Sequence, residues 1–233
     1  MRFWRDLARR VGGPVLELGC GTARVSVPVA RTGVRLVGVD RSERMLARGR
    51  QRMRRAKLAG NMSLVRADIR ALPFRFPGPF GLVIAPYGVL QSLLSDSDLI
   101  ATLESVAAVS GPGATFGIDL VADLPTWQQY RRRVRLRGSR RGGHAGDRLT
   151  LIESVRQEPA ERLTIFDQEY VERRGTEERR HRFSLAFRTV SVPEMTDRLE
   201  RAGFRITAVH GDYDGHPWDP RAEVWLILAT RGA

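Results

Sequence analysis

The chain alternates short apolar runs with amphipathic stretches over residues 14–120. Apolar runs of about 4–8 residues are typical of buried parallel strands, and the stretches between them repeat apolar positions at helical spacing. Strands are predicted at residues 14–19, 34–40, 62–68, 80–86 and 114–120. Helices are predicted at 23–31, at 42–58 behind the cap Ser42, and at 96–109 ahead of Gly111-Pro112-Gly113. Strands that alternate with helices indicate a parallel sheet with right-handed crossovers.

The pattern changes to an alternation of period two between residues 131 and 190. The β-rich runs there are residues 149–155, 163–171 and 181–190, with turn residues between them. They predict an antiparallel meander of three or four strands, inserted into the parallel unit. A helix at 192–202 and strands at 204–210 and 223–230 then complete the first pattern. The expected division is a core over 1–124, a β-rich cap over 125–190, and completion of the core by 191–233.

The composition is that of a globular chain, with 233 residues of which 42% are hydrophobic. No apolar run approaches the roughly 20 residues that span a bilayer, and the first ten residues have no signal-peptide core. The single cysteine, Cys20, excludes an intramolecular disulfide and a thiolate zinc cluster. We therefore expect a cytoplasmic protein without a bound metal.

The formal net charge is +13, and Lys57 is the only lysine among 39 basic residues. This use of arginine favours codon bias in a GC-rich genome over a phosphate-binding surface, which stays the alternative. The charge is distributed in blocks, with the segments 67–124 and 189–233 net acidic. Aspartates follow predicted strands in these blocks: Asp96, Asp98, Asp119, Asp123, Asp212, Asp214 and Asp219. An acidic mouth at the carboxyl edge of the sheet would favour an amine ligand, whereas aspartates that cap turns would be purely structural.

A glycine motif lies between the first strand and the first helix. Gly19 and Gly21 allow a tight turn and close approach of a ligand to the backbone, and the helix presents its N–H groups there. Asp40 ends the second strand, where a carboxylate accepts hydrogen bonds from both hydroxyls of a ribose. Asp68 and Ile69 end the third strand, placed for the edge and the face of an adenine. Together these residues predict an adenosine-containing cofactor.

The motif differs from a dinucleotide loop at two positions. Arg24 stands where G-x-G-x-x-G has its third glycine, and Glu17 precedes Gly19 by two residues. The resulting E-x-G-x-G resembles the class I S-adenosylmethionine-dependent methyltransferases, with Ala23 in place of their usual third glycine. The resemblance implies S-adenosylmethionine as cofactor and a role for Glu17 in orienting the loop and holding the methionine ammonium. The cofactor-binding residues expected on this basis are Glu17, Gly19, Cys20, Gly21, Asp40, Arg41, Asp68, Ile69 and Ala85.

The segment after the fourth strand reads Ile84-Ala85-Pro86-Tyr87. Nucleic-acid amino-methyltransferases carry a polar residue at the start of this segment, and here it is missing. The order of elements instead resembles the small-molecule branch, which includes the glycine, sarcosine and amino-sugar N-methyltransferases. This resemblance implies a Rossmann-like, doubly wound sheet of seven strands, mostly parallel with the last strand antiparallel, and an inserted antiparallel β cap.

The expected acceptor is a small molecule, methylated on an amine nitrogen or alternatively on oxygen. The cofactor already carries an activated methyl group, so the protein mainly aligns the acceptor and takes its proton. The candidates for this work are Tyr87, His210 and Asp119, with His216 as a further base. No membrane and no nucleic acid is expected as a partner, and a homodimer stays open.

Two other functions stay open from the sequence. Seven arginines within residues 131–141 would suit RNA or an acidic protein partner, which makes an RNA or protein methyltransferase the first alternative. The same arginines would also protect a solvated edge strand from aggregation. The second alternative is a cofactor-binding protein without turnover. Steep salt dependence of RNA binding would favour the first, and cofactor binding without product would favour the second.

Overall fold

The computed structural model describes residues 1–74, 80–121, 129–138, 147–222 and 224–232. The chain forms two compact units: Met1–Ala122 with Ser191–Ala233 is unit 1, and Asp123–Val190 is unit 2. Among the described residues, every helix is too short or too polar to cross a bilayer.

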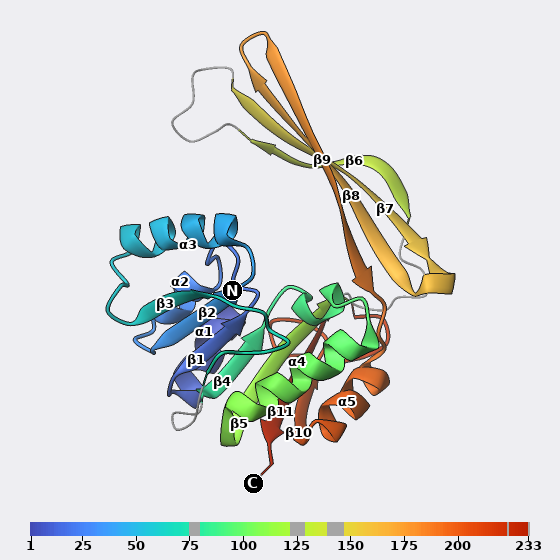
Figure 1. Ribbon diagram of the computed structural model, residues 1–233. Helices are drawn as coiled ribbons and strands as arrows, with labels where there is room; N and C mark the ends of the chain where they lie inside the picture. The colour runs from blue at the N-terminus through green and yellow to red at the C-terminus, as the bar shows by residue number, and fades with distance from the viewer. Residues whose placement is uncertain (75–79, 122–128, 139–146, 223, 233) are drawn as a thin grey trace. The chain divides into compact units, whose positions relative to one another are not determined.

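Unit 1 is built on a seven-stranded sheet of order β10-β11-β5-β4-β1-β2-β3 (Figure 1). Its strands are β1 Val15–Leu18, β2 Leu36–Asp40, β3 Met62–Arg66, β4 Phe80–Ala85, β5 Ser110–Val121, β10 Phe204–His210 and β11 Val224–Arg231. Strand β11 runs antiparallel to both β5 and β10, and the other neighbours are parallel. The predicted fold class is therefore confirmed.

The helices of unit 1 are α1 Arg2–Val11, α2 Ser26–Ala30, α3 Glu43–Arg55, α4 Asp96–Val109 and α5 Val192–Arg201, with a short 3-10 helix η1 at Val89–Ser92. The hydroxyls of Ser42, Ser95 and Ser191 accept backbone N–H groups at the starts of α3, α4 and α5. The helix expected from residue 23 begins only at residue 26. Ala23 has a φ of 60°, in the left-handed region that a right-handed helix excludes, so the glycine loop extends further than the sequence pattern predicted.

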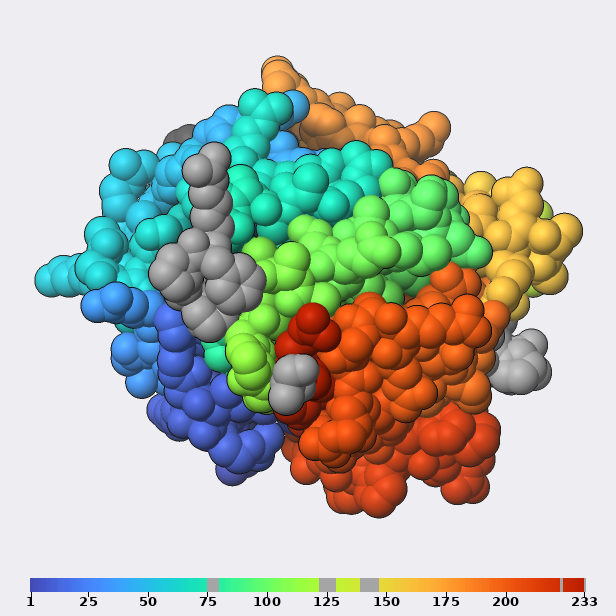
Figure 2. Space-filling view, turned by 60° about the horizontal axis from the view of Figure 1, so that its bottom comes forward, coloured from blue at the N-terminus to red at the C-terminus, as the bar shows by residue number. Residues whose placement is uncertain are grey.

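The two faces of this sheet are covered by different helices. Trp4 and Leu7 of α1 belong to one apolar cluster with residues of α2, β1 and β11. Helices α4 and α5 lie side by side in both views (Figure 1, Figure 2), and Arg198 of α5 pairs with Asp96 of α4 at 3.0 Å. Because both faces are covered, the central strands β1 and β4 are buried at nearly every position.

Unit 2 is a four-stranded antiparallel sheet of order β6-β7-β8-β9. Its strands are β6 Tyr130–Gly138, β7 Arg148–Glu158, β8 Leu163–Arg174 and β9 Glu177–Arg188. The predicted meander therefore has four strands. Across neighbouring strands, Tyr170 stacks on Phe183 and Phe166 meets Phe187 edge to face, each pair at a centroid distance of 5.7 Å. Cross-strand aromatic pairs of this kind stabilise a sheet and fix its register.

Gly117 of β5 lies at a place where α1 packs closely on the sheet. A Cβ atom there would lie 2.9 Å from the Trp4 ring and 3.3 Å from Leu7. We expect Gly117→Ala to lower the free energy of unfolding by about 1–3 kcal/mol, because the buried indole has no room to move away. Urea denaturation measures this change. Gly60→Ala is the matched control, since a Cβ at Gly60 meets nothing within 4 Å. Equal stability of the two variants would contradict the close packing of α1 on β5.

Candidate cofactor and acceptor site

The glycine loop after β1 turns through three left-handed residues, which are Gly19, Gly21 and Ala23. Gly19 and Gly21 have φ values of 60° and 52°. A Cβ at Gly19 would lie 2.8 Å from a methyl of Val89, so a larger residue would clash at this position. These conformations and this contact require glycine, as the motif predicted.

Asp40 joins the glycine loop to the end of β2. Its Oδ2 accepts the N–H of Gly21 at 2.9 Å, and its Oδ1 accepts the N–H of Ser42 at 2.8 Å. A carboxylate offers about four lone-pair positions, so each oxygen keeps capacity for a further donor. The geometry fits a carboxylate that is fixed by the backbone and free to accept the two hydroxyls of a ribose.

A pocket of about 340 Å³ lies at this edge of the sheet. It brings together Gly19, Asp40, Arg41, Asp68 and Ile69, all of them predicted as cofactor-binding. Further lining residues that the sequence analysis did not assign to the cofactor are Ala67, Arg70, Val89, Ser92, Leu93 and Asp98. The pocket thus has one wall from the loop after β3 and another from η1 and the start of α4.

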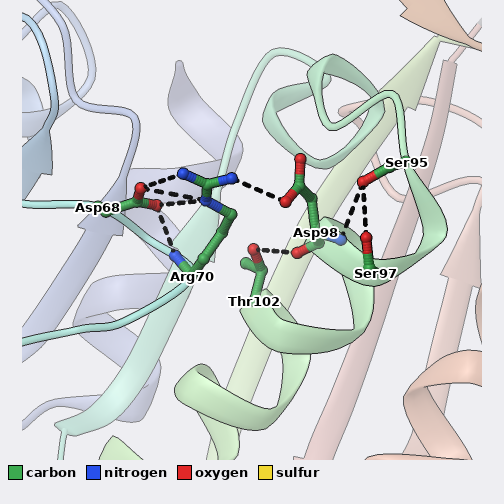
Figure 3. A network of polar contacts seen from close by, with 6 residues as sticks. All are labelled: Asp68, Arg70, Ser95, Ser97, Asp98 and Thr102. Carbon is green, nitrogen blue, oxygen red and sulfur yellow. Dashed lines mark hydrogen bonds and ion pairs between the residues drawn. The ribbon is translucent and has the colours of Figure 1, made fainter.

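Arg70 bridges these two walls (Figure 3). Its Nη2 and Nε donate to Asp68 at 2.6 and 3.0 Å, and its Nη1 donates to Asp98 at 2.8 Å. The bonds from Arg70 hold the pKa of Asp68 at about 2. Asp68 is therefore ionised at neutral pH and acts only as an acceptor. Sequence reasoning missed Arg70, although the Asp-x-Arg spacing suits the turn in which Asp68 accepts the Arg70 N–H.

Glu17 lies beneath the loop and is 2% exposed. Burial raises the pKa of its carboxyl to about 8, with the negative charge of Asp40 adding to the shift. Its Oε2 is buried and has no hydrogen-bond partner among the described residues. A buried acceptor without a partner is costly, and the ammonium of the methionine moiety is the kind of group that would satisfy it. The hydrogen-bond acceptors at this edge of the sheet therefore fit S-adenosylmethionine.

Cys20 lies in the same loop but points away from solvent. It is 4% exposed, its N–H donates to the Val39 carbonyl, and its side chain fills the space over Gly38. Burial raises the pKa of the thiol well above its usual range. The side chain thus fills a small buried space, and Cys20 takes part in the loop through its backbone.

The segment after β4 makes a second left-handed turn. Tyr87 and Gly88 have φ values of 64° and 66°, and Tyr87 lies two residues after the buried Ala85. Asp119, which is 2% exposed, accepts the N–H of Gly88 at 2.9 Å and the hydroxyl of Tyr213 at 2.5 Å. Burial raises the pKa of the Asp119 carboxyl. Both oxygens of Asp119 are therefore engaged, one with this turn and the other with Tyr213.

The ring of Tyr87 is 45% exposed, and the guanidinium of Arg24 lies over it at 4.5 Å from the centroid. His210 is half-buried at the end of β10, with its ring 6.0 Å from Phe3. Leu226 of β11 is the register partner of both His210 and Asp119, so these two side chains share one face of the sheet. The three residues predicted as catalytic therefore come from the ends of β4, β5 and β10.

The predicted acidic mouth is not supported, because local groups engage most of its aspartates. Asp98 pairs with Arg70, Asp219 with Arg221, and Asp212 with His216 at 2.6 Å. Asp212 also accepts two backbone N–H groups of its own turn. Asp96 pairs with Arg198, and Asp123 lies outside the described residues. The turn-capping interpretation accounts for these side chains better than an acidic mouth does.

Comparison with known proteins identifies the domain. Residues 15–113 match the family described as "Methyltransferase domain". The cypemycin N-terminal methyltransferase of Streptomyces sp is 26% identical over 231 residues, which cover 94% of this chain and 84% of the relative. The chain therefore contains a methyltransferase domain. It spans between 42% and 47% of the length of several other curated methyltransferases that it matches.

Solved structures share the fold of this methyltransferase at lower identity. An S-adenosylmethionine-dependent methyltransferase from Clostridium acetobutylicum ATCC 824 superposes with a TM-score of 0.80 at 16% identity, covering 100% of this chain and 92% of that one. The sugar N-methyltransferase KedS8 from Streptoalloteichus sp ATCC 53650 has a TM-score of 0.75 at 15% identity, covering 100% and 86%. The solved structures include an amino pentose methyltransferase with bound S-adenosylmethionine, which supports the predicted cofactor.

Removal of the Asp40 carboxylate tests whether this residue binds the ribose of the cofactor. Two charge-assisted hydrogen bonds, each worth about 1.5–3 kcal/mol, predict that Asp40→Ala weakens S-adenosylhomocysteine binding at least about tenfold. Calorimetry measures the affinity, and Asp197→Ala on the exposed side of α5 is the control. Unchanged affinity in a folded Asp40 variant would remove this residue from the site.

The raised pKa of Glu17 predicts a pH-dependent affinity. Below about pH 8 the carboxyl is protonated, and the ligand ammonium requires the ionised form, so binding releases a proton. Affinity for S-adenosylhomocysteine should therefore rise from pH 6 to pH 8, by at most about tenfold per pH unit. Calorimetry in buffers of different ionisation enthalpy detects the released proton. Glu17→Gln should abolish both effects, and a flat profile in the unmodified chain would show that Glu17 does not meet the ammonium.

Proposed function

We propose that this methyltransferase transfers the methyl group of S-adenosylmethionine to an amine nitrogen of a small molecule. The ring of Tyr87 supports this proposal more than any other feature. It is exposed at the carboxyl end of β4, and a guanidinium already lies over its face. An aromatic face that attracts one cation suits another, such as an ammonium.

The backbone at Tyr87 is held in a costly conformation. A bulky residue in the left-handed region costs about 1–3 kcal/mol and persists only where its surroundings fix it. Asp119 supplies that constraint through Gly88, and Tyr213 fixes Asp119 in turn. We assign Asp119 to positioning the Tyr87 turn rather than to taking a proton.

The residues before Tyr87 argue against a nucleobase acceptor. Ile84, Ala85 and Pro86 are buried and carry no side-chain hydrogen-bond acceptor. An exocyclic base amine would therefore find no side-chain partner at this segment. The names of two relatives point in the same direction, since one is an N-terminal methyltransferase and another a sugar N-methyltransferase.

The proton of the acceptor requires a base. The cofactor supplies an activated methyl group on a sulfonium, so the protein's part is to orient the amine and keep it neutral. His210 is the candidate that we favour. Its imidazole has no hydrogen-bond partner among the described residues, and it shares a sheet face with Asp119. The ring of Tyr87 would hold the amine.

An acceptor screen tests the proposal. Labelled methyl donor is incubated with a small-amine library, total RNA and a protein extract, and products are identified by mass. We expect label on a small amine and a rate that rises with pH until the amine or its base is deprotonated. Label confined to RNA or protein, or products methylated on oxygen, would contradict it.

Variants of Tyr87 then test the acceptor position. A cation–π contact of about 0.5–2 kcal/mol predicts that Tyr87→Leu raises KM by roughly 3–30-fold, whereas Tyr87→Phe keeps most of the affinity. Binding of S-adenosylhomocysteine should be equal in both variants, which controls for the fold. Equal KM values in the Leu and Phe variants would remove the ring from acceptor binding.

A further inference from the structure

One face of the four-stranded sheet in unit 2 carries a basic groove. The groove has a volume of about 730 Å³ and is lined by five arginines and two acidic residues. The arginines are Arg132, Arg137, Arg148, Arg173 and Arg180, and they come from all four strands. We call this concavity the arginine groove.

Two of these arginines lack a carboxylate. Glu178 pairs with Arg173 at 2.8 Å and with Arg180 at 2.6 Å. Arg137 and Arg148 form no ion pair within the part of the chain that the structure describes. Their positive charges are therefore available to a ligand.

The register of the strands places like charges together. Arg148 of β7 lies directly opposite Arg173 of β8. Thr150, two residues along β7, is the partner of Arg137 on β6, so all three side chains share one face. Like charges directly opposite one another destabilise a sheet. A bound anion would relieve this repulsion, which gives the cluster a reason to exist that stability alone does not.

Protection of a sheet edge does not explain the cluster. In the order β6-β7-β8-β9, strands β7 and β8 are internal and have neighbours on both sides. Arg148 and Arg173 lie on these internal strands, where no edge needs protection. The edge explanation holds for arginines of β6 but not for the groove as a whole.

The lining of the groove indicates the kind of anion. Val134, Ile152 and Val171 give it aliphatic surface, and its lining as described holds no aromatic residue. Stacking platforms for bases are therefore missing, and the acidic residues Asp147 and Glu178 would repel a continuous phosphate backbone. Isolated carboxylates that are separated by apolar surface fit this lining better. We propose that the arginine groove docks an acidic peptide segment of a partner protein, independently of methyl transfer.

Fluorescence anisotropy with a labelled oligoglutamate peptide tests the groove on the full chain. The variant carrying Arg137→Gln and Arg148→Gln should bind the peptide at least about fivefold more weakly at low salt. The matched control carries Arg54→Gln and Arg55→Gln on α3, which removes the same charge from exposed positions of unit 1, and should stay within about twofold of the unmodified chain. Added NaCl should weaken binding to the unmodified chain.

A stability measurement separates a binding site from a structural one. Arg148→Gln alone should leave the unfolding midpoint unchanged or raise it, because it removes the repulsion with Arg173. A lowered midpoint would show that Arg148 is structural and would overturn the proposal. Equal losses of peptide affinity in the two double variants would show that binding depends only on the net charge of the chain, and would contradict the proposal. Tighter binding of a charge-matched single-stranded oligonucleotide, lost with the same two arginines, would assign the groove to nucleic acid instead.

Discussion

The buried carboxylate of Asp119 is the interaction on which the acceptor end of the core depends. It joins three segments by accepting the Gly88 N–H after β4 and the Tyr213 hydroxyl after β10, while itself lying in β5. A buried carboxylate is costly unless its oxygens are hydrogen-bonded, so removal of either donor would disturb the other. Through these bonds the unfavourable backbone of Tyr87 stays in place, and with it the ring that faces Arg24.

Carboxylates at the carboxyl edge of the sheet are used in three different ways. Asp40 is fixed by two backbone N–H groups and keeps lone pairs for a ligand. Asp68 is held ionised by Arg70, which also ties the loop after β3 to α4. Glu17 is buried with one oxygen unsatisfied. Environment rather than residue type therefore separates a carboxylate fixed by the backbone, a carboxylate ionised in an ion pair, and a buried carboxyl with a raised pKa.

Net charge describes this chain poorly, because many of its acidic side chains are paired with neighbouring arginines. The aspartates that follow the strands bind neighbouring arginines, a histidine or their own turns. In unit 2, the nearly buried Glu169 is contacted by Arg132, Arg180 and Arg182. The remaining basic charge is not distributed uniformly over the surface. The pairing register of β7 and β8 places part of it in the arginine groove. Position on the sheet therefore decides what an arginine does.

The sequence by itself determined the order of strands and helices, the glycines of the loop and the starts of the capped helices, because periodicity, glycine and serine act over a few neighbouring residues. It also led from Glu17, Gly19, Gly21 and Asp40 to the cofactor. Only the tertiary structure decided the left-handed backbone of Tyr87, the bridge made by Arg70 and the engagement of both Asp119 oxygens. The bond between Asp119 and Tyr213 joins residues 94 positions apart, and no local pattern encodes such a pairing.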